Sequence, residues 1–172
     1  MPDIAMSHLI GTLILMILLS TVAFFSLQQI MDTGFRSSKI YLQEVCERFS
    51  SEIMDMLNLY YLEHKSAYIY RIIDIPVHVN DKGYVIKLEN DSLGWKVVSY
   101  VYGYEVFKVE SRLYIRSGVE VVNSSGSFDV GNGRIVYDSM IYSGVSKPVV
   151  WCKLNPDTGL VQVGIGRLEV KG

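Results

Sequence analysis

The longest pattern in the chain is an uninterrupted apolar run near its start. From Leu9 to Met31 there is no ionisable residue in 23 positions, and the only polar residues before Ser26 are Thr12, Ser20 and Thr21. A helix of that length extends about 34 Å, which is enough to cross a hydrocarbon core of about 30 Å. Because hydroxyls can bond to the carbonyls of their own helix, we predict a membrane-spanning helix over residues 1–31.

The next pattern has helical periodicity with a single apolar stripe. Apolar residues recur every three or four positions between Leu42 and Tyr60, with charged and amide side chains between them. This spacing predicts an amphipathic stalk helix over residues 32–66. Ser37 or Ser38 is a candidate cap, unless one continuous helix runs through Gly34, which the absence of proline at positions 3–75 allows.

Beyond Ser66 the pattern becomes that of strands, so the expected fold class is α+β. Short runs rich in β-branched and aromatic residues alternate with Gly, Asn, Asp and Pro, and the segment 155–159 has the composition of a hairpin turn. The predicted strands are 84–88, 95–102, 105–115, 119–122, 134–137, 149–154 and 160–163. We expect an antiparallel, sandwich-like β domain over residues 67–172.

The distribution of charge separates the first 35 residues from the remainder of the chain, which we call the body. Residues 1–35 contain no Lys or Arg and two acids, Asp3 and Asp32, whereas residues 36–172 hold all 16 basic residues and 16 acids. A neutral body argues against a nucleic-acid partner, which requires a concentrated basic surface. Arg36 and Lys39 directly follow the span, so the positive-inside rule would place the body in the cytoplasm.

The N-terminal residues resemble those of a known family. Ala5–Ile17 is similar to the start of archaeal type IV pilin-like proteins, with Ser7, Ile10, Gly11 and Thr12 matching and His8 where proline is usual. Ile75-Pro76 followed by Gly83–Leu88 is similar to a segment after the long helix in minor archaeal pilin-like proteins.

This resemblance implies a structural cell-surface protein rather than an enzyme. It would be anchored in the membrane or polymerised into an extracellular filament through its N-terminal helix, and it would display the β domain outside the cell. The implied partners are the membrane, copies of itself or other pilin-like subunits, and an envelope layer. The residues expected to pack between helices are Ile10, Gly11, Leu13, Ile14, Ile17 and Leu18.

Two other functions stay open. Pilin precursors usually carry Lys or Arg just before the processing site, and residues 1–6 contain neither. An uncleaved anchor of the kind that accompanies the archaellum, or holds its motor, is therefore an alternative. The second alternative is an anchored domain that binds a ligand or glycan through the surface of Trp95, Tyr100, Tyr102 and Tyr104. The last three alternate and would share a face if their strand continued through Gly103.

Chemistry-bearing patterns are sparse, and we expect no cofactor and no metal. The histidines His8, His64 and His78 lack the spacing of a metal pair. Gly131–Gly133 and Gly164–Gly166 are not followed by a phosphate-loop pattern, so we interpret them as turns and bulges.

Two features bear on the compartment. Asn90 and Asn123 begin triplets that accept N-linked glycans, which favours an outer location for the body. Cys46 and Cys152 either form one long-range disulfide or remain buried thiols.

Overall fold

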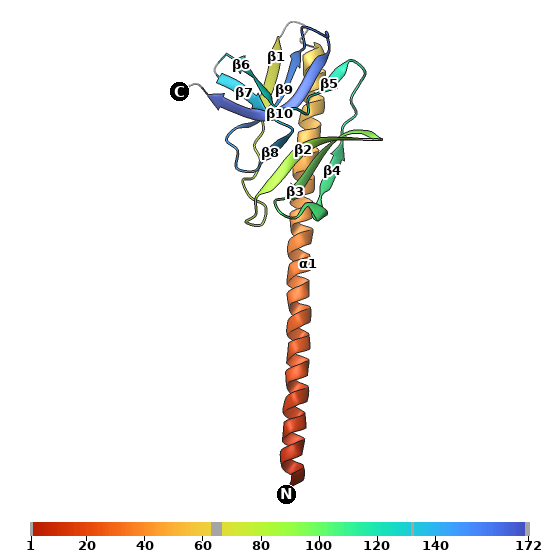
Figure 1. Cartoon of the computed structure of the whole chain (residues 1–172), viewed down its shortest axis with the longest axis vertical. Coiled ribbons are helices and arrows are strands. Elements are labelled where there is room, and N and C mark those ends of the chain that lie inside the picture. The colour runs from red at the N-terminus through yellow and green to blue at the C-terminus, as the bar shows by residue number, and fades with distance from the viewer. Residues whose placement is uncertain (1, 63–66, 132, 171–172) are drawn as a thin grey trace. The chain divides into compact units, whose positions relative to one another are not determined.

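The computed structural model of the chain describes residues 2–62, 67–131 and 133–170. It consists of helix α1 (Pro2–Leu62) followed by ten strands, and it divides into two compact units, Met1–Ser37 and Ser38–Gly172 (Figure 1). The helical assignment continues through Gly34, so Ser37 and Ser38 lie inside α1 and do not cap a second helix.

Within the second unit, the stripe of α1 that the sequence predicts is buried. The exposed fraction of each of its apolar side chains is 5% or less, and Tyr60 at its end is half-buried. The predicted amphipathic pattern is therefore confirmed from Leu42 onward, because one face of the helix lies in the core and the other in solvent. The buried residues are Leu42, Val45, Cys46, Phe49, Ile53, Met56 and Leu57.

The larger sheet has six strands in the order β1-β9-β10-β7-β6, with β5 also paired to β10. The hairpin of β9 and β10 is closed by residues 155–159, as predicted, with hydrogen bonds from Asn155 N to Leu160 O and from Gly159 N to Asn155 O. All strand pairs of this six-stranded sheet are antiparallel, except that β5 runs parallel to β10. The strands are β1 (Tyr68–Ile72), β5 (Val119–Val121), β6 (Gly126–Val130), β7 (Gly133–Tyr137), β9 (Pro148–Leu154) and β10 (Val161–Val170).

The smaller sheet has four antiparallel strands in the order β4-β3-β2-β8. Its centre is the hairpin of β2 and β3, in which Tyr84 pairs with Val101 at one end and Asp91 with Gly94 at the other. A short 3₁₀ helix, η1 (Glu105–Phe107), connects β3 to β4. The strands are β2 (Tyr84–Asp91), β3 (Gly94–Val101), β4 (Val109–Arg112) and β8 (Met140–Tyr142).

One hydrophobic core unites the helix stripe with a face of each sheet. Phe49 of α1, Ile86 of β2 and Ile165 of β10 belong to the same buried cluster. A smaller cluster around Trp151 lies on the other face of the six-stranded sheet. The predicted α+β class, a long N-terminal helix followed by antiparallel sheets, is confirmed, and the helix from Ser38 onward is an integral part of the β body's core.

Several strand predictions were wrong in detail. The expected strand 105–115 divides into η1 and the four residues of β4, and β1, β6 and β8 were not expected at all. Gly164 and Gly166 lie inside β10 and not in a turn. A side chain at Gly164 would meet the ring of Trp151, so this glycine is needed for close packing across the sheet.

Candidate functional site

The most unusual surface of the protein is the apolar segment of α1, defined here as residues 9–30. Each of its large hydrophobic side chains has more than half of its surface exposed, with values from 54% to 69%. Soluble monomers rarely expose apolar surface on this scale without a partner for it. By length and composition, α1 includes a stretch able to cross a membrane.

Three hydroxyls of the apolar segment are satisfied by the helix itself. The hydroxyl of Thr12 donates to His8 O at 2.6 Å, that of Ser20 to Met16 O at 2.7 Å, and that of Thr21 to Ile17 O at 2.7 Å. In hydrocarbon an unsatisfied hydroxyl would cost several kcal/mol, on the order of 4–8. The predicted back-bonding is confirmed, and it removes the main obstacle to placing these residues in lipid.

The residues expected to pack between helices all lie on this segment and are exposed. Around Gly11 there is open space within 4 Å of where a Cβ would stand. The other five have exposed fractions of 54–59%, so they are available to lipid or to another helix. They are Ile10, Leu13, Ile14, Ile17 and Leu18.

Of the two alternatives for Cys46 and Cys152, the structure contains the buried thiols and not the disulfide. Cys46 and Cys152 are both free and fully buried. The Cys46 thiol donates to the carbonyl of Val109 at 3.7 Å. Cys152 is near Tyr60: burial of the Tyr60 phenol raises its pKa, and the charge of a Cys152 thiolate raises it further. Because both thiols are free, no disulfide joins the helix to β9.

Burial also sets the chemistry of these thiols. It raises the pKa of Cys46 to about 12 and that of Cys152 to about 12. A thiol that remains protonated at physiological pH is a poor nucleophile, so neither cysteine is a candidate for catalysis.

The predicted aromatic surface is not a single face. The strand β3 ends at Val101, and Gly103 has a φ of 79°, which turns the chain away from the sheet. Tyr100 is 7% exposed and packs against Val85 and Val98 on the face of the sheet opposite the helix. Trp95 packs against the main core on the other face. A binding surface that combines Trp95 with the three tyrosines is therefore wrong.

Two of these tyrosines are nevertheless exposed, and one contacts another aromatic ring while the other contacts a lysine. The ring of Tyr102 lies 6.2 Å from that of Tyr142 of β8, in an edge-to-face arrangement. The ammonium of Lys82 lies 4.5 Å from the centre of the Tyr104 ring. These neighbours are distant in sequence, so no local pattern could have indicated them.

Both predicted glycan acceptors are exposed. Asn90 lies near the end of β2, and Asn123 follows β5 in a loop. Their accessibility meets the geometric requirement for modification.

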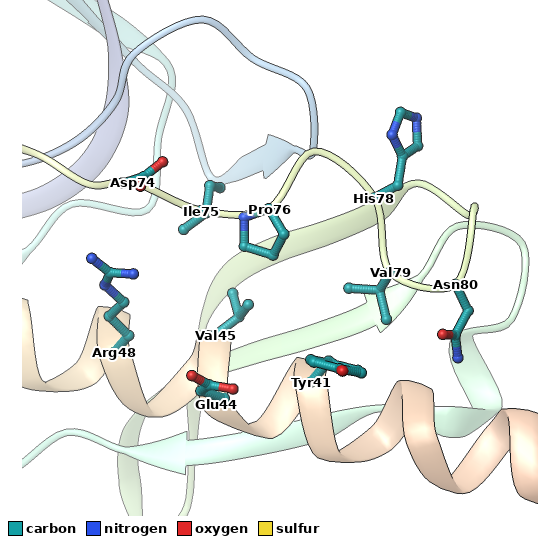
Figure 2. Close-up of a pocket in the computed structure, with 10 residues that line it drawn as sticks. All are labelled: Tyr41, Glu44, Val45, Arg48, Asp74, Ile75, Pro76, His78, Val79 and Asn80. Atoms are coloured by element: carbon teal, nitrogen blue, oxygen red, sulfur yellow. The ribbon is translucent and has the colours of Figure 1, made fainter.

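A pocket of about 410 Å³ lies between α1 and the loop that follows β1 (Figure 2). Its floor is apolar, with Val45 and Ile75, and its rim carries the charged groups Glu44, Arg48 and Asp74. Figure 2 shows His78 directed away from the helix. No two of these rim groups form an ion pair within the part of the chain that the structure describes, so they do not constitute an organised acid–base site.

Among the described residues no group of three or more His, Cys, Asp or Glu side chains could hold a metal ion. His8 lies at the start of the apolar segment and His78 at the pocket, while His64 lies outside the described residues.

A tight turn at residues 79–82 positions this loop on the helix. Asn80 and Asp81 have φ values of 49° and 59°, and Val79 and Lys82 exchange backbone hydrogen bonds across them. The Asn80-Asp81-Lys82-Gly83 run indicated a turn. Its contact with Ser38, 42 positions earlier, could not be predicted from it.

Comparison with protein-family models, with curated proteins and with solved structures finds no match to the chain.

Proposed function

We propose that the protein is a structural cell-surface subunit of the type IV pilin-like kind. Its apolar segment is held in the membrane or in the axis of a filament, and its body is displayed outside the cell.

The observation that supports this most strongly is the apolar segment itself. It combines 22 positions without an ionisable residue, exposed apolar side chains, and hydroxyls bonded within the helix. Removing a single exposed Leu or Ile side chain from water contributes about 1.5–3 kcal/mol. Summed over the segment, this strongly favours a lipid or a packed helical environment over water.

The pilin-like part of the proposal comes from the residues at the start of that segment. Ser7, Ile10, Gly11 and Thr12 match the family pattern, and a helix with a small residue such as Gly11 can approach a neighbour closely. In this function the subunit resides in the bilayer until its N-terminal helix leaves the lipid and packs with the helices of other subunits along the filament axis.

One departure from the family pattern favours a second candidate, an anchor that does not polymerise. His8 stands where the family usually has proline. An uncleaved archaellum-type accessory protein would use the same apolar segment for membrane retention alone and would engage an envelope layer or motor with its body.

Fractionation distinguishes the two. Filaments sheared from cells and membranes of the same cells are probed for the protein, and its N-terminal residue in each fraction is determined by mass spectrometry. A subunit shortened before the apolar segment and recovered in filaments supports the pilin-like function. Recovery of the unshortened chain in membranes alone supports the anchor. Recovery of most of the chain as a soluble monomer contradicts both.

The orientation of the body is tested by the glycan acceptors. We expect the mass of peptides containing Asn90 or Asn123 to include glycan if the body is outside, and labelling of intact cells with an impermeant amine reagent to modify the body's lysines. Protection of every lysine in intact cells would place the body inside.

A further inference from the structure

The exposed aromatic side chains of the second unit are concentrated at one of its ends. Among its described side chains, seven aromatic residues are exposed: Tyr41, Tyr61, Tyr102, Tyr104, Phe107, Tyr114 and Tyr142. Five of them form what we call the aromatic rim: Tyr41, Tyr102, Tyr104, Phe107 and Tyr142.

Side-chain contacts connect the rim to the residue at which the second unit begins. The amide of Asn80 donates to the hydroxyl of Ser38, the first residue of that unit, at 2.7 Å. Tyr41 and Asn80 line the same pocket, and Lys82, two residues later, lies over Tyr104. The rim therefore lies at the Ser38 end of the body.

The remaining members join this group through the sheet. Tyr102 N donates to Gly83 O at 2.9 Å, and Phe107 N donates to Tyr104 O at 3.1 Å. Tyr142 is paired with Val85 at the start of β2 and contacts the ring of Tyr102. The opposite end of the hairpin, at Leu93, is eight residues of β2 away, or about 25 Å.

Chain length limits how far this end can be from the apolar segment. Residues 31–37 connect the two, and seven residues span at most about 25 Å when fully extended. If the apolar segment is in a bilayer, as the proposed function requires, the Ser38 end is the part of the body that covalent connection keeps nearest to the lipid surface.

Tyrosine suits that surface because its ring is apolar and its hydroxyl is polar, and such residues are enriched where membranes meet water. The charges of the same loops are balanced: Lys82 and Lys108 are accompanied by Asp81 and Glu105. The rim thus has the character of an interfacial aromatic belt and lacks that of a polybasic patch.

We propose that the aromatic rim rests in the headgroup region of the membrane that holds the apolar segment, so that the body is docked on the lipid surface. This inference rests on the proposed function for the membrane anchor. The rim replaces the water around its rings with lipid headgroups and the glycerol region, and it fixes which end of the body faces the bilayer.

The test uses the full chain in phosphatidylcholine vesicles, with a fluorescent maleimide at one introduced cysteine. Cys46 and Cys152 are fully buried and stay unlabelled in the folded protein. The reporting position is Glu105→Cys, exposed beside Tyr104, and the matched control is Leu93→Cys, exposed at the far end of the same hairpin. A third variant, Ile17→Cys, reports on the apolar segment.

We expect a headgroup-attached nitroxide lipid to quench the probe at 105 about threefold more strongly than the probe at 93, because only the rim lies in the interfacial layer. The quenching should persist at high salt, since the rim charges are balanced. Replacing Tyr102 and Phe107 together by Ser should lower quenching at 105 to the level at 93, with Cys46 and Cys152 still protected as evidence of folding.

Each other outcome overturns the proposal. Equal quenching at 105 and 93 excludes docking while leaving the anchor intact. If the probe at 105 is shielded from solvent only at high protein concentration, and the nitroxide lipid does not quench it, the rim contacts a second copy of the chain and not the membrane. If a nitroxide on the acyl chains fails to quench the probe at 17, the anchor itself is wrong, and the docking proposal fails with it.

Discussion

The side-chain amide of Asn80 donates a hydrogen bond of 2.7 Å to the hydroxyl of Ser38, which joins a two-residue turn to the first residue of the body's helix. Ser38 is 8% exposed, and the turn holds Asn80 at a φ of 49°. Asparagine tolerates this left-handed conformation better than most residues, and its amide reaches the helix.

We therefore expect Asn80→Ala to destabilise the body by about 1–2 kcal/mol, since it loses the hydrogen bond and meets backbone strain. Asn80→Gly removes only the hydrogen bond, and Ser38→Ala does the same from the other side. A double-mutant cycle of Asn80→Gly with Ser38→Ala, measured by thermal unfolding in detergent, should give a coupling of about 1 kcal/mol. Strict additivity would show that the bond contributes nothing.

The core between helix and sheets should be the main source of the body's stability. Phe49 is fully buried in the cluster shared by α1 and both sheets. Phe49→Ala should cost about 3–5 kcal/mol in the free energy of unfolding. Ser51→Ala, on the exposed side of the same helix, should change it by less than about 0.5 kcal/mol. Similar losses for the two variants would mean that the helix does not pack on the sheets.

The buried thiols predict a loss of stability in alkaline solution. Because burial raises the pKa of Cys46 and of Cys152 from 9.0 to about 12, the folded protein keeps both protons above pH 9 while the unfolded chain loses them. The unfolded state then binds fewer protons, so the free energy of unfolding falls as pH rises from 9 towards 12. Tyr84, whose pKa burial raises to about 12, acts in the same direction from pH 10.

At about pH 10 each thiol should already have cost about 1 kcal/mol, measured as the difference in unfolding free energy from about pH 8. Cys152→Ala should be less stable than the parent at the lower pH, because the substitution leaves a cavity. Its free energy of unfolding should fall less between the lower and the higher pH, because one titrating thiol is gone. A parallel pH dependence of parent and variant would contradict the assignment.

The same thiols should be unreactive in the native protein. We expect no modification of Cys46 or Cys152 by maleimide under native conditions and complete modification of both after denaturation without reductant. Incomplete modification in the second case would reveal a disulfide that the structure does not contain.

The predictable parts of the fold were those with a local cause. The stripe from Leu42 to Tyr60 was visible because a helix repeats every 3.6 residues, and the hairpin at 155–159 because Pro and Gly determine its turn. The strands that escaped prediction depend on distant partners. The three residues of β8 are held by β2, and β5 pairs with the parallel strand β10, 42 positions later.

The candidate site divides in the same way. The apolar segment and its back-bonded hydroxyls follow from composition and helix geometry alone. The alternation of Tyr100, Tyr102 and Tyr104 was misleading because β3 ends at Val101 and Gly103 turns the chain. The aromatic rim is assembled from α1, the connection between β3 and β4, and strand β8. Long-range contacts of this kind have no signature in a short window of sequence.

A single charge within the apolar segment tests most directly our proposal that this segment places the protein in a membrane or filament. Ile17→Asp puts an acid at the centre of the run, where insertion costs about 2.5–3.5 kcal/mol more. The matched control, Leu62→Asp, introduces the same charge on an exposed residue at the other end of α1.

The measurement is the fraction of each variant recovered with membranes and filaments after cell lysis, with circular dichroism as the control for folding of the body. We predict that Ile17→Asp moves the folded protein into the soluble fraction or leaves it unassembled, while Leu62→Asp behaves as the parent does. Parental membrane retention and normal filaments for Ile17→Asp would contradict the account.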